Sequence, residues 1–114
     1  QYKLDNLTAI LDHNGLQIDG RNDEVMNIEP IEDKWKAFGW YTIRIDGHDM
    51  QQIIDALDRA KETKERPTLI IANTVKGKGV SYMENQVGWH GTAPDKEQRD
   101  KAIEELTQRG EGIE

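Results

Sequence analysis

The sequence predicts an α/β fold in three layers, a parallel sheet with flanking helices on both of its faces. Segments typical of strands alternate with segments typical of helices along the chain, which favours this class. The apolar run "TLIIANTV" (68–75) also lacks the polar alternation of a half-exposed strand. We therefore expect it to be a strand that helices cover on both sides.

The first half of the chain is expected to form a strand, a loop and a helix. The segment "NLTAILD" (6–12) is short and apolar, and an Asn-Gly turn signal follows it. Residues 13–29 are mostly polar and are predicted to be a loop. The helix begins at Pro30 and stops at Gly39, with Ile31, Trp35 and Phe38 on its packed face. Trp40 should pack at the transition to the next strand.

The second half continues the alternation. Residues 40–46 are predicted to be a strand, and Asp49 is a suitable N-cap for a helix over 50–63. That helix has an apolar stripe with helical spacing, made of Met50, Ile53, Ile54, Leu57 and Ala60. The strand 68–75 comes next, then a loop of about twenty residues and a charged helix from about 95 to 109. Because three strands make a small sheet, we expect it to be part of a larger one.

Composition narrows the possible functions. The 114 residues have room for one domain at most, and a net charge of -7 argues against binding nucleic acid or an anionic membrane surface. No apolar run is long enough to span a bilayer. The absence of cysteine excludes disulfides and fits a reducing, cytoplasmic setting. A strand-like start without an initiator methionine indicates a fragment or a processed chain.

Polar residues gather where the expected strands end, which is where open α/β sheets bind ligands. The amide oxygen of Asn14 is a hard, neutral ligand suited to Mg²⁺ or Ca²⁺. Gly15 lets the chain turn, so that a following main-chain carbonyl can face the same ion. Taken alone, however, an Asn-Gly pair is more often an ordinary turn.

The long loop 76–95 contains two further candidates. The segment "VKGKGV" offers two glycines and the lysines Lys76 and Lys78, but it lacks the ending of a phosphate-binding P-loop. His90 stands between Gly88 and Gly91, where its imidazole could exchange a proton or donate to a phosphate or carbonyl oxygen. The alternative is an exposed loop histidine without a role.

Taken together, four stretches resemble the transketolase family, whose members use thiamine diphosphate and a divalent ion. They are "YKLDNLTAILDHNGLQIDG", "KWKAFGWYTIRIDGHD", "RPTLIIANTVKGKGVSYMEN" and "GWHGTAPD", and they extend from Tyr2 to about Asp95. The resemblance is greatest to the type that is split into N-terminal and C-terminal polypeptides. It implies that residues 1–114 form the second half of a thiamine-diphosphate-binding domain, without the upstream Gly-Asp-Gly motif.

The resemblance also implies roles for particular residues. Asn14 and the main-chain carbonyl of Leu16 would be ligands of the Mg²⁺ or Ca²⁺ ion. Ile18 would be an apolar contact to the cofactor, and His90 would lie near the diphosphate and the sugar substrate as a catalytic residue. The aspartate of the Gly-Asp-Gly motif would be a further ligand, but it is absent from this chain.

The implied activity is transfer of a two-carbon ketol unit between sugar phosphates, as in the pentose phosphate pathway. The partners would be the remainder of the transketolase chain or a C-terminal subunit, in a homodimer or higher assembly, and the isolated chain is expected to be inactive. Two alternatives remain open. One is a related enzyme such as 1-deoxyxylulose-5-phosphate synthase, and the other is a non-catalytic α/β module that binds a partner or assembles.

Overall fold

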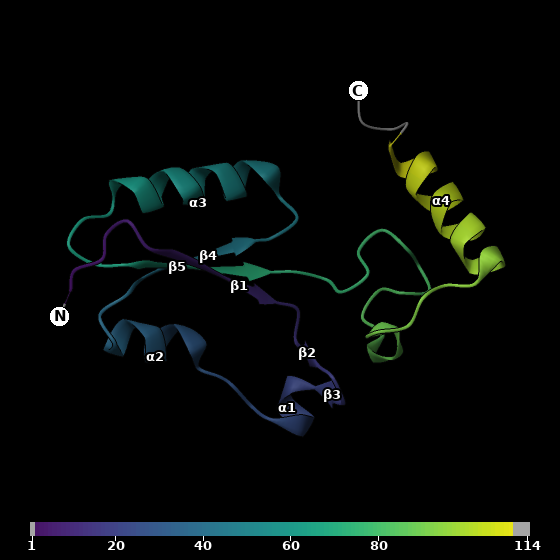
Figure 1. Ribbon diagram of the computed structural model, residues 1–114, viewed down its shortest axis with the longest axis horizontal. Coiled ribbons are helices and arrows are strands. Elements are labelled where there is room, and N and C mark those ends of the chain that lie inside the picture. The colour runs from purple at the N-terminus through teal and green to yellow at the C-terminus, as the bar shows by residue number, and fades with distance from the viewer. Residues whose placement is uncertain (1, 111–114) are drawn as a thin grey trace. The chain divides into compact units, whose positions relative to one another are not determined.

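The computed structural model describes residues 2–110, and contacts within it divide the chain into two compact units. One unit comprises residues 1–14 and 26–74, and the other comprises residues 15–25 and 75–114. The sheet and its helices belong to the first unit (Figure 1). In the described part of the chain, no helix is long and apolar enough to cross a membrane.

The first unit is built on a sheet of three parallel strands. Strand β5 (Thr68–Asn73) lies in the centre, between β1 (Thr8–His13) and β4 (Tyr41–Asp46). Each edge strand pairs with all six residues of β5. The predicted α/β class is confirmed, and the apolar run is the central strand.

Helices cover both faces of this sheet, as Figure 1 shows. On one face Leu69 and Ile71 pack against Ile31 of α2 (Ile31–Ala37). On the other face Ile70 and Ala72 form a cluster with Ala56 of α3 (Met50–Glu62). The side chains of β5 alternate between these two clusters, which explains why its four middle residues, 69–72, are all apolar.

The two helices differ from expectation in what they bury. Phe38 was expected to pack, but it follows the last residue of α2 as its C-cap and is 84% exposed. The rings of Trp35 and Trp40 instead meet edge to face, with centroids 4.7 Å apart. Both rings pack against the buried cluster on the α2 side of the sheet. In α3 the N-cap at Asp49 is confirmed by its hydrogen bond from the Gln52 N–H.

The apolar stripe of α3 is covered only in part. Ala60 is buried and Ile53 packs against the core, whereas Met50 and Ile54 are exposed. Ala56, which was not in the predicted stripe, is almost completely buried. A small side chain at this position allows the helix to approach the sheet closely.

The second unit contains short elements and one long helix. Residues 13–29, predicted to be a loop, hold the two-residue strands β2 (Leu16–Gln17) and β3 (Gly20–Arg21) and the short helix α1 (Asn22–Val25). Strands β2 and β3 pair in antiparallel fashion. The loop 76–95 contains the 3-10 turn η1 (Val87–Trp89), and α4 (Lys96–Gly110) agrees with the predicted helix.

Candidate functional site

The carboxyl ends of the three parallel strands meet at one edge of the sheet. Asn73 at the end of β5 pairs with His13 at the end of β1 and with Asp46 at the end of β4. The expected gathering of strand-end residues is therefore present within the first unit.

Asn73 links the two outer strands through its side chain. Its amide oxygen accepts a hydrogen bond of 2.9 Å from Arg44 Nη1 and lies 3.3 Å from His13 Nδ1. The other ring nitrogen of His13 lies 3.1 Å from Glu29 Oε1. These contacts fix His13 from both sides, immediately before Asn14.

A second group of contacts ties the strand ends together. The Thr74 hydroxyl hydrogen-bonds to the Asp12 carboxylate, and the Thr74 N–H donates to the His13 carbonyl at 3.2 Å. Gly47, after β4, donates its N–H to the Asn73 carbonyl at 2.7 Å. A Cβ atom on Gly47 would lie 2.5 Å from the Thr74 methyl group, so this approach requires glycine.

Asn14 follows β1 directly and is the last residue of its segment of the first unit. Gly15 has a φ of +74°, a conformation that favours glycine, so the predicted turn is present. Its carbonyl accepts a 3.0 Å hydrogen bond from the Asn22 N–H. The side-chain oxygen of Asn22 is buried and has no hydrogen-bond partner among residues 2–110. Asn22 was not singled out from the sequence.

Leu16 and Ile18, the two residues predicted with Asn14 to contact the metal ion or the cofactor, belong to the second unit. Leu16 opens β2 and pairs with Arg21 of β3. Ile18 lies in the turn between the two strands, and its side chain is 68% exposed. An isoleucine this exposed has its apolar surface available for contact with a ligand.

The glycine-rich segment 76–80 has a defined local structure. Gly77 and Gly79 both have positive φ values, of +71° and +101°. A Cβ on Gly77 would lie 2.7 Å from the main chain of Met83, so the loop is folded closely onto itself. Lys76 contributes its carbonyl to this fold, accepting a hydrogen bond from the Asn85 N–H at 3.0 Å.

His90 immediately follows the η1 turn. Its N–H donates to the Val87 carbonyl at 2.9 Å, and its side chain is exposed. The preceding residue, Trp89, donates its indole N–H to the Tyr82 carbonyl at 3.0 Å. The main chain at His90 is thus held by the turn, while the imidazole is accessible to solvent.

The two predicted metal ligands, Asn14 and Leu16, both offer neutral oxygen atoms. An Asn amide oxygen and a main-chain carbonyl are neutral oxygen donors, which suit Mg²⁺ or Ca²⁺. In the described part of the chain, no three His, Asp or Glu side chains are grouped as a metal site would need. The donor types at Asn14 and Leu16 fit such an ion, and further donors would have to come from elsewhere.

The predicted site residues fall into both units. Asn14 belongs to the first, and Leu16, Ile18 and His90 belong to the second. Their assembly into one site stays a prediction. The side-chain contacts of Asn73 and of the Tyr82 hydroxyl were missed from the sequence because their partners lie 16 to 60 residues away. For these contacts the sequence offered one signal, which is that Trp89 stands directly before the predicted site residue His90.

Nearly the whole chain is similar to known proteins. Residues 1–109 match the model of a family described as "Transketolase, thiamine diphosphate binding domain". The chain is 46% identical over 114 residues to one of the subunits of apulose-4-phosphate transketolase from Phocaeicola vulgatus, and it covers 41% of that relative. It is 42% identical over 108 residues to the 6-deoxy-6-sulfo-D-fructose transketolase subunit SqwG of a Clostridium species, covering 95% of this chain and 39% of that protein.

A solved structure agrees with this result. Transketolase from Campylobacter jejuni superposes with a TM-score of 0.83 at 36% sequence identity. The superposition covers 92% of this chain and 16% of the other. The chain thus spans well under half the length of each of these relatives.

Proposed function

The chain belongs to the transketolase family, and we propose that it contributes part of a thiamine diphosphate and metal site to an enzyme that transfers two-carbon ketol units between sugar phosphates. The match of residues 1–109 to the family's cofactor-binding domain carries this proposal. The strand-end arrangement of Asn14 supports it, because this edge of an α/β sheet is where ligands bind.

Asn14 and Leu16 would hold the divalent ion through the Asn amide oxygen and the Leu main-chain carbonyl. Neutral oxygen ligands of this kind leave the ion's positive charge available to neutralise diphosphate oxygens. Ile18 would cover an apolar part of the cofactor with its exposed side chain. Thiamine diphosphate supplies the electron sink for breaking the carbon–carbon bond next to a carbonyl group.

His90 would act on the substrate side of this site. Its exposed imidazole can donate an N–H to a phosphate or carbonyl oxygen, or carry a proton near neutral pH. Gly88 and Gly91 lie on either side of it, and among residues 2–110 a Cβ at either glycine would meet no atom within 4 Å beyond its chain neighbours.

The remaining parts of the site would come from further polypeptide. Two of the relatives are named as transketolase subunits, which supports a second polypeptide as partner for this chain as well. The Gly-Asp-Gly aspartate would be the third protein ligand of the metal ion. A dimeric assembly and a cytoplasmic location, both expected from the sequence, belong to the same proposal.

The sugar substrate has two candidates. A pentose phosphate pathway substrate is the family-level expectation, but two similar relatives are named for apulose-4-phosphate and 6-deoxy-6-sulfo-D-fructose. A split transketolase for a modified sugar is thus the second candidate. Ketol transfer assayed with both classes of donor separates the two.

Calorimetry with thiamine diphosphate and Mg²⁺ tests the proposal on the chain assembled with the rest of the transketolase. We expect binding, and we expect Asn14→Ala to abolish it. Asn6→Ala, the same change before the opposite end of β1, is the matched control and should bind normally. Absence of cofactor binding by the assembled wild-type protein would overturn the proposal and favour a non-catalytic module.

A further inference from the structure

Helix α4 and the loop before it are joined by several side-chain contacts. Tyr82 donates its hydroxyl to the Gln98 carbonyl of α4 at 2.6 Å, and Ser81 hydrogen-bonds twice to Glu105 of the same helix. The Gly79 N–H donates to Glu84 at 2.9 Å, and Arg109 lies 3.7 Å from the same carboxylate oxygen. The loop is therefore fastened along most of the helix.

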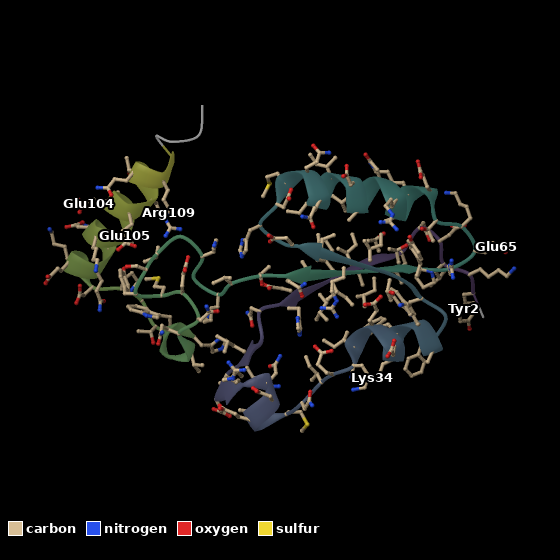
Figure 2. All side chains as sticks on the ribbon, turned by 180° about the vertical axis from the view of Figure 1, so that it is seen from behind. Tyr2, Lys34, Glu65, Glu104, Glu105 and Arg109 are labelled. Atoms are coloured by element: carbon tan, nitrogen blue, oxygen red, sulfur yellow. The ribbon has the colours of Figure 1, made fainter. Side chains whose placement is uncertain are left out.

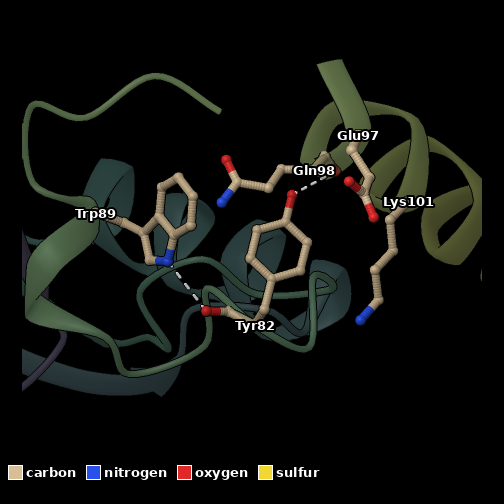
Figure 3. Close-up of a pocket in the computed structure, with 5 residues that line it drawn as sticks. All are labelled: Tyr82, Trp89, Glu97, Gln98 and Lys101. Atoms are coloured by element: carbon tan, nitrogen blue, oxygen red, sulfur yellow. Dashed lines mark hydrogen bonds between the residues drawn. The ribbon is translucent and has the colours of Figure 1, made fainter. Parts of the chain in front are cut away.

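Tyr82 is in contact with both α4 and the turn that precedes His90. Its hydroxyl bonds to the helix, while its own carbonyl accepts the indole N–H of Trp89 (Figure 3). The two rings also contact each other, with centroids 5.3 Å apart. Trp89 is the last residue of η1, and His90 follows it. Tyr82 thus connects helix α4, through Trp89, to the main chain at His90.

These hydrogen bonds help to hold Tyr82, because one side of its ring borders an open cavity. An open cavity of about 300 Å³ lies beside its ring, lined by Tyr82, Trp89, Glu97, Gln98 and Lys101. Close packing is therefore missing on that side of the ring. The Lys101 ammonium group, 5.6 Å from the ring centroid, is a weak further constraint.

The hydroxyl of Tyr82 is protonated near neutral pH and can donate a hydrogen bond. Burial, together with the negative charges of Glu105 and Asp95, raises the pKa of Tyr82 above its ordinary value. The hydroxyl therefore keeps its proton, and the bond to the Gln98 carbonyl persists.

We propose that Tyr82 is a positioning residue for His90, and that it holds the Val87–Trp89 turn in place from helix α4. The inference rests on the proposed role of His90 as a substrate-side residue. Tyr82 acts through Trp89 and does not itself touch the reacting groups. A correctly placed imidazole matters because displacement of a catalytic group by about 1 Å can cost on the order of a hundredfold in rate.

The first test measures hydrogen exchange at the Trp89 indole N–H and the His90 main-chain N–H by NMR in the full chain. Tyr82→Phe keeps the ring and removes only the hydroxyl. We expect exchange at both sites to become about fivefold to tenfold faster, as loss of one hydrogen bond predicts. The indole groups of Trp35 and Trp40 are internal controls, because both belong to the other unit.

The matched variant is Tyr41→Phe. This substitution also removes a hydroxyl contact, the one between Tyr41 and Arg59 in the first unit, so it reports the effect of such a loss outside the second unit. It should leave exchange at Trp89 and His90 unchanged. Unchanged exchange at these two groups in Tyr82→Phe would overturn the proposal.

The second test uses the enzyme assembled with its remaining polypeptide. Tyr82→Phe should lower kcat for ketol transfer about fivefold to tenfold without changing the Kd for thiamine diphosphate. Faster exchange at His90 with an unchanged kcat would refute positioning. If the wild-type assembly transfers no ketol unit, the proposed function fails, and the exchange result alone decides whether Tyr82 places His90.

Discussion

The carboxylate of Glu105 receives both hydrogen-bond donors of Ser81. The Ser81 N–H lies 2.6 Å from Glu105 Oε2, and the Ser81 hydroxyl lies 2.7 Å from Glu105 Oε1. These hydrogen bonds, first the one from the main-chain N–H and then the one from the hydroxyl, lower the pKa of Glu105. Figure 2 shows Glu105 on α4, with Glu104 and Arg109 on the same helix. The two hydrogen bonds between Ser81 and Glu105 anchor the loop 76–95 to helix α4.

Glu105→Gln should therefore destabilise the chain in a pH-dependent way. The folded-state pKa of Glu105 is below the unfolded value of about 4.3, so its contribution is fully present above that pH. The contribution is lost as pH falls through the folded-state pKa. Urea denaturation of wild type and variant should show a difference at pH 7 that shrinks steadily below about pH 4.

The neighbouring Glu104→Gln is the control for this prediction. Glu104 is exposed, and its side chain approaches that of Gln108 at 3.4 Å on the same helix. Its substitution should leave the urea midpoint nearly unchanged. Equal effects of the two substitutions would show that Glu105 acts through overall charge and not through Ser81.

Gly47→Ala should destabilise the first unit. The added Cβ would lie 2.5 Å from the Thr74 methyl group and 3.1 Å from the Asn73 carbonyl, so β4 and β5 must shift apart. Overpacking of this kind costs about 1–3 kcal/mol, measurable by thermal or urea denaturation. Gly88→Ala is the control, since in the described part of the chain its Cβ would meet no atom within 4 Å beyond its chain neighbours. A wild-type urea midpoint for Gly47→Ala would contradict the prediction.

Much of the fold could be predicted because its signals are local. The helical period of α3, the Asp49 cap and the apolar run of β5 are each read from neighbouring residues. Strands β2 and β3 were missed because two residues are too few for a periodic pattern. Phe38 was misplaced because α2 ends one residue before it, and no rule of periodicity fixes a helix end that closely.

The candidate site was predictable only in its motif. Asn14 follows a strand that the sequence pattern predicts, and Gly15 lies in a turn that the Asn-Gly pair predicts. The local conformation of both residues could therefore be foreseen. The contact between Ser81 and Glu105 spans 24 residues, and that between His13 and Asn73 spans 60. Contacts at such separations leave no trace in a single sequence, because each partner has ordinary surface chemistry.

Ile18→Ala should weaken cofactor binding without weakening the fold. Its side chain is exposed in this chain, so little buried apolar surface is lost on substitution. If it covers thiamine diphosphate, removal of its outer carbons should raise the Kd about 5- to 30-fold in the assembled enzyme. Calorimetry measures the Kd, and thermal denaturation of the chain checks the fold. An unchanged Kd would exclude Ile18 from the cofactor contact.

Ile10→Lys should reduce self-association of the isolated chain. In the described part of the chain β1 pairs with β5 alone, so its outer edge has unpaired main-chain groups. The Ile10 side chain is 63% exposed beside an apolar groove that Ile53 and Leu57 of α3 also line. An open apolar edge favours pairing with a second copy, and a lysine there opposes it.

Light scattering across a concentration series measures this association. Wild type should show a mass that rises towards that of a dimer, and Ile10→Lys should stay close to 13.1 kDa. Gln51→Lys makes the same change of charge on an exposed position of α3 and should associate like wild type. A wild-type chain that stays monomeric at millimolar concentration would refute edge pairing, because the exposed β1 edge would then be insufficient to recruit a second copy.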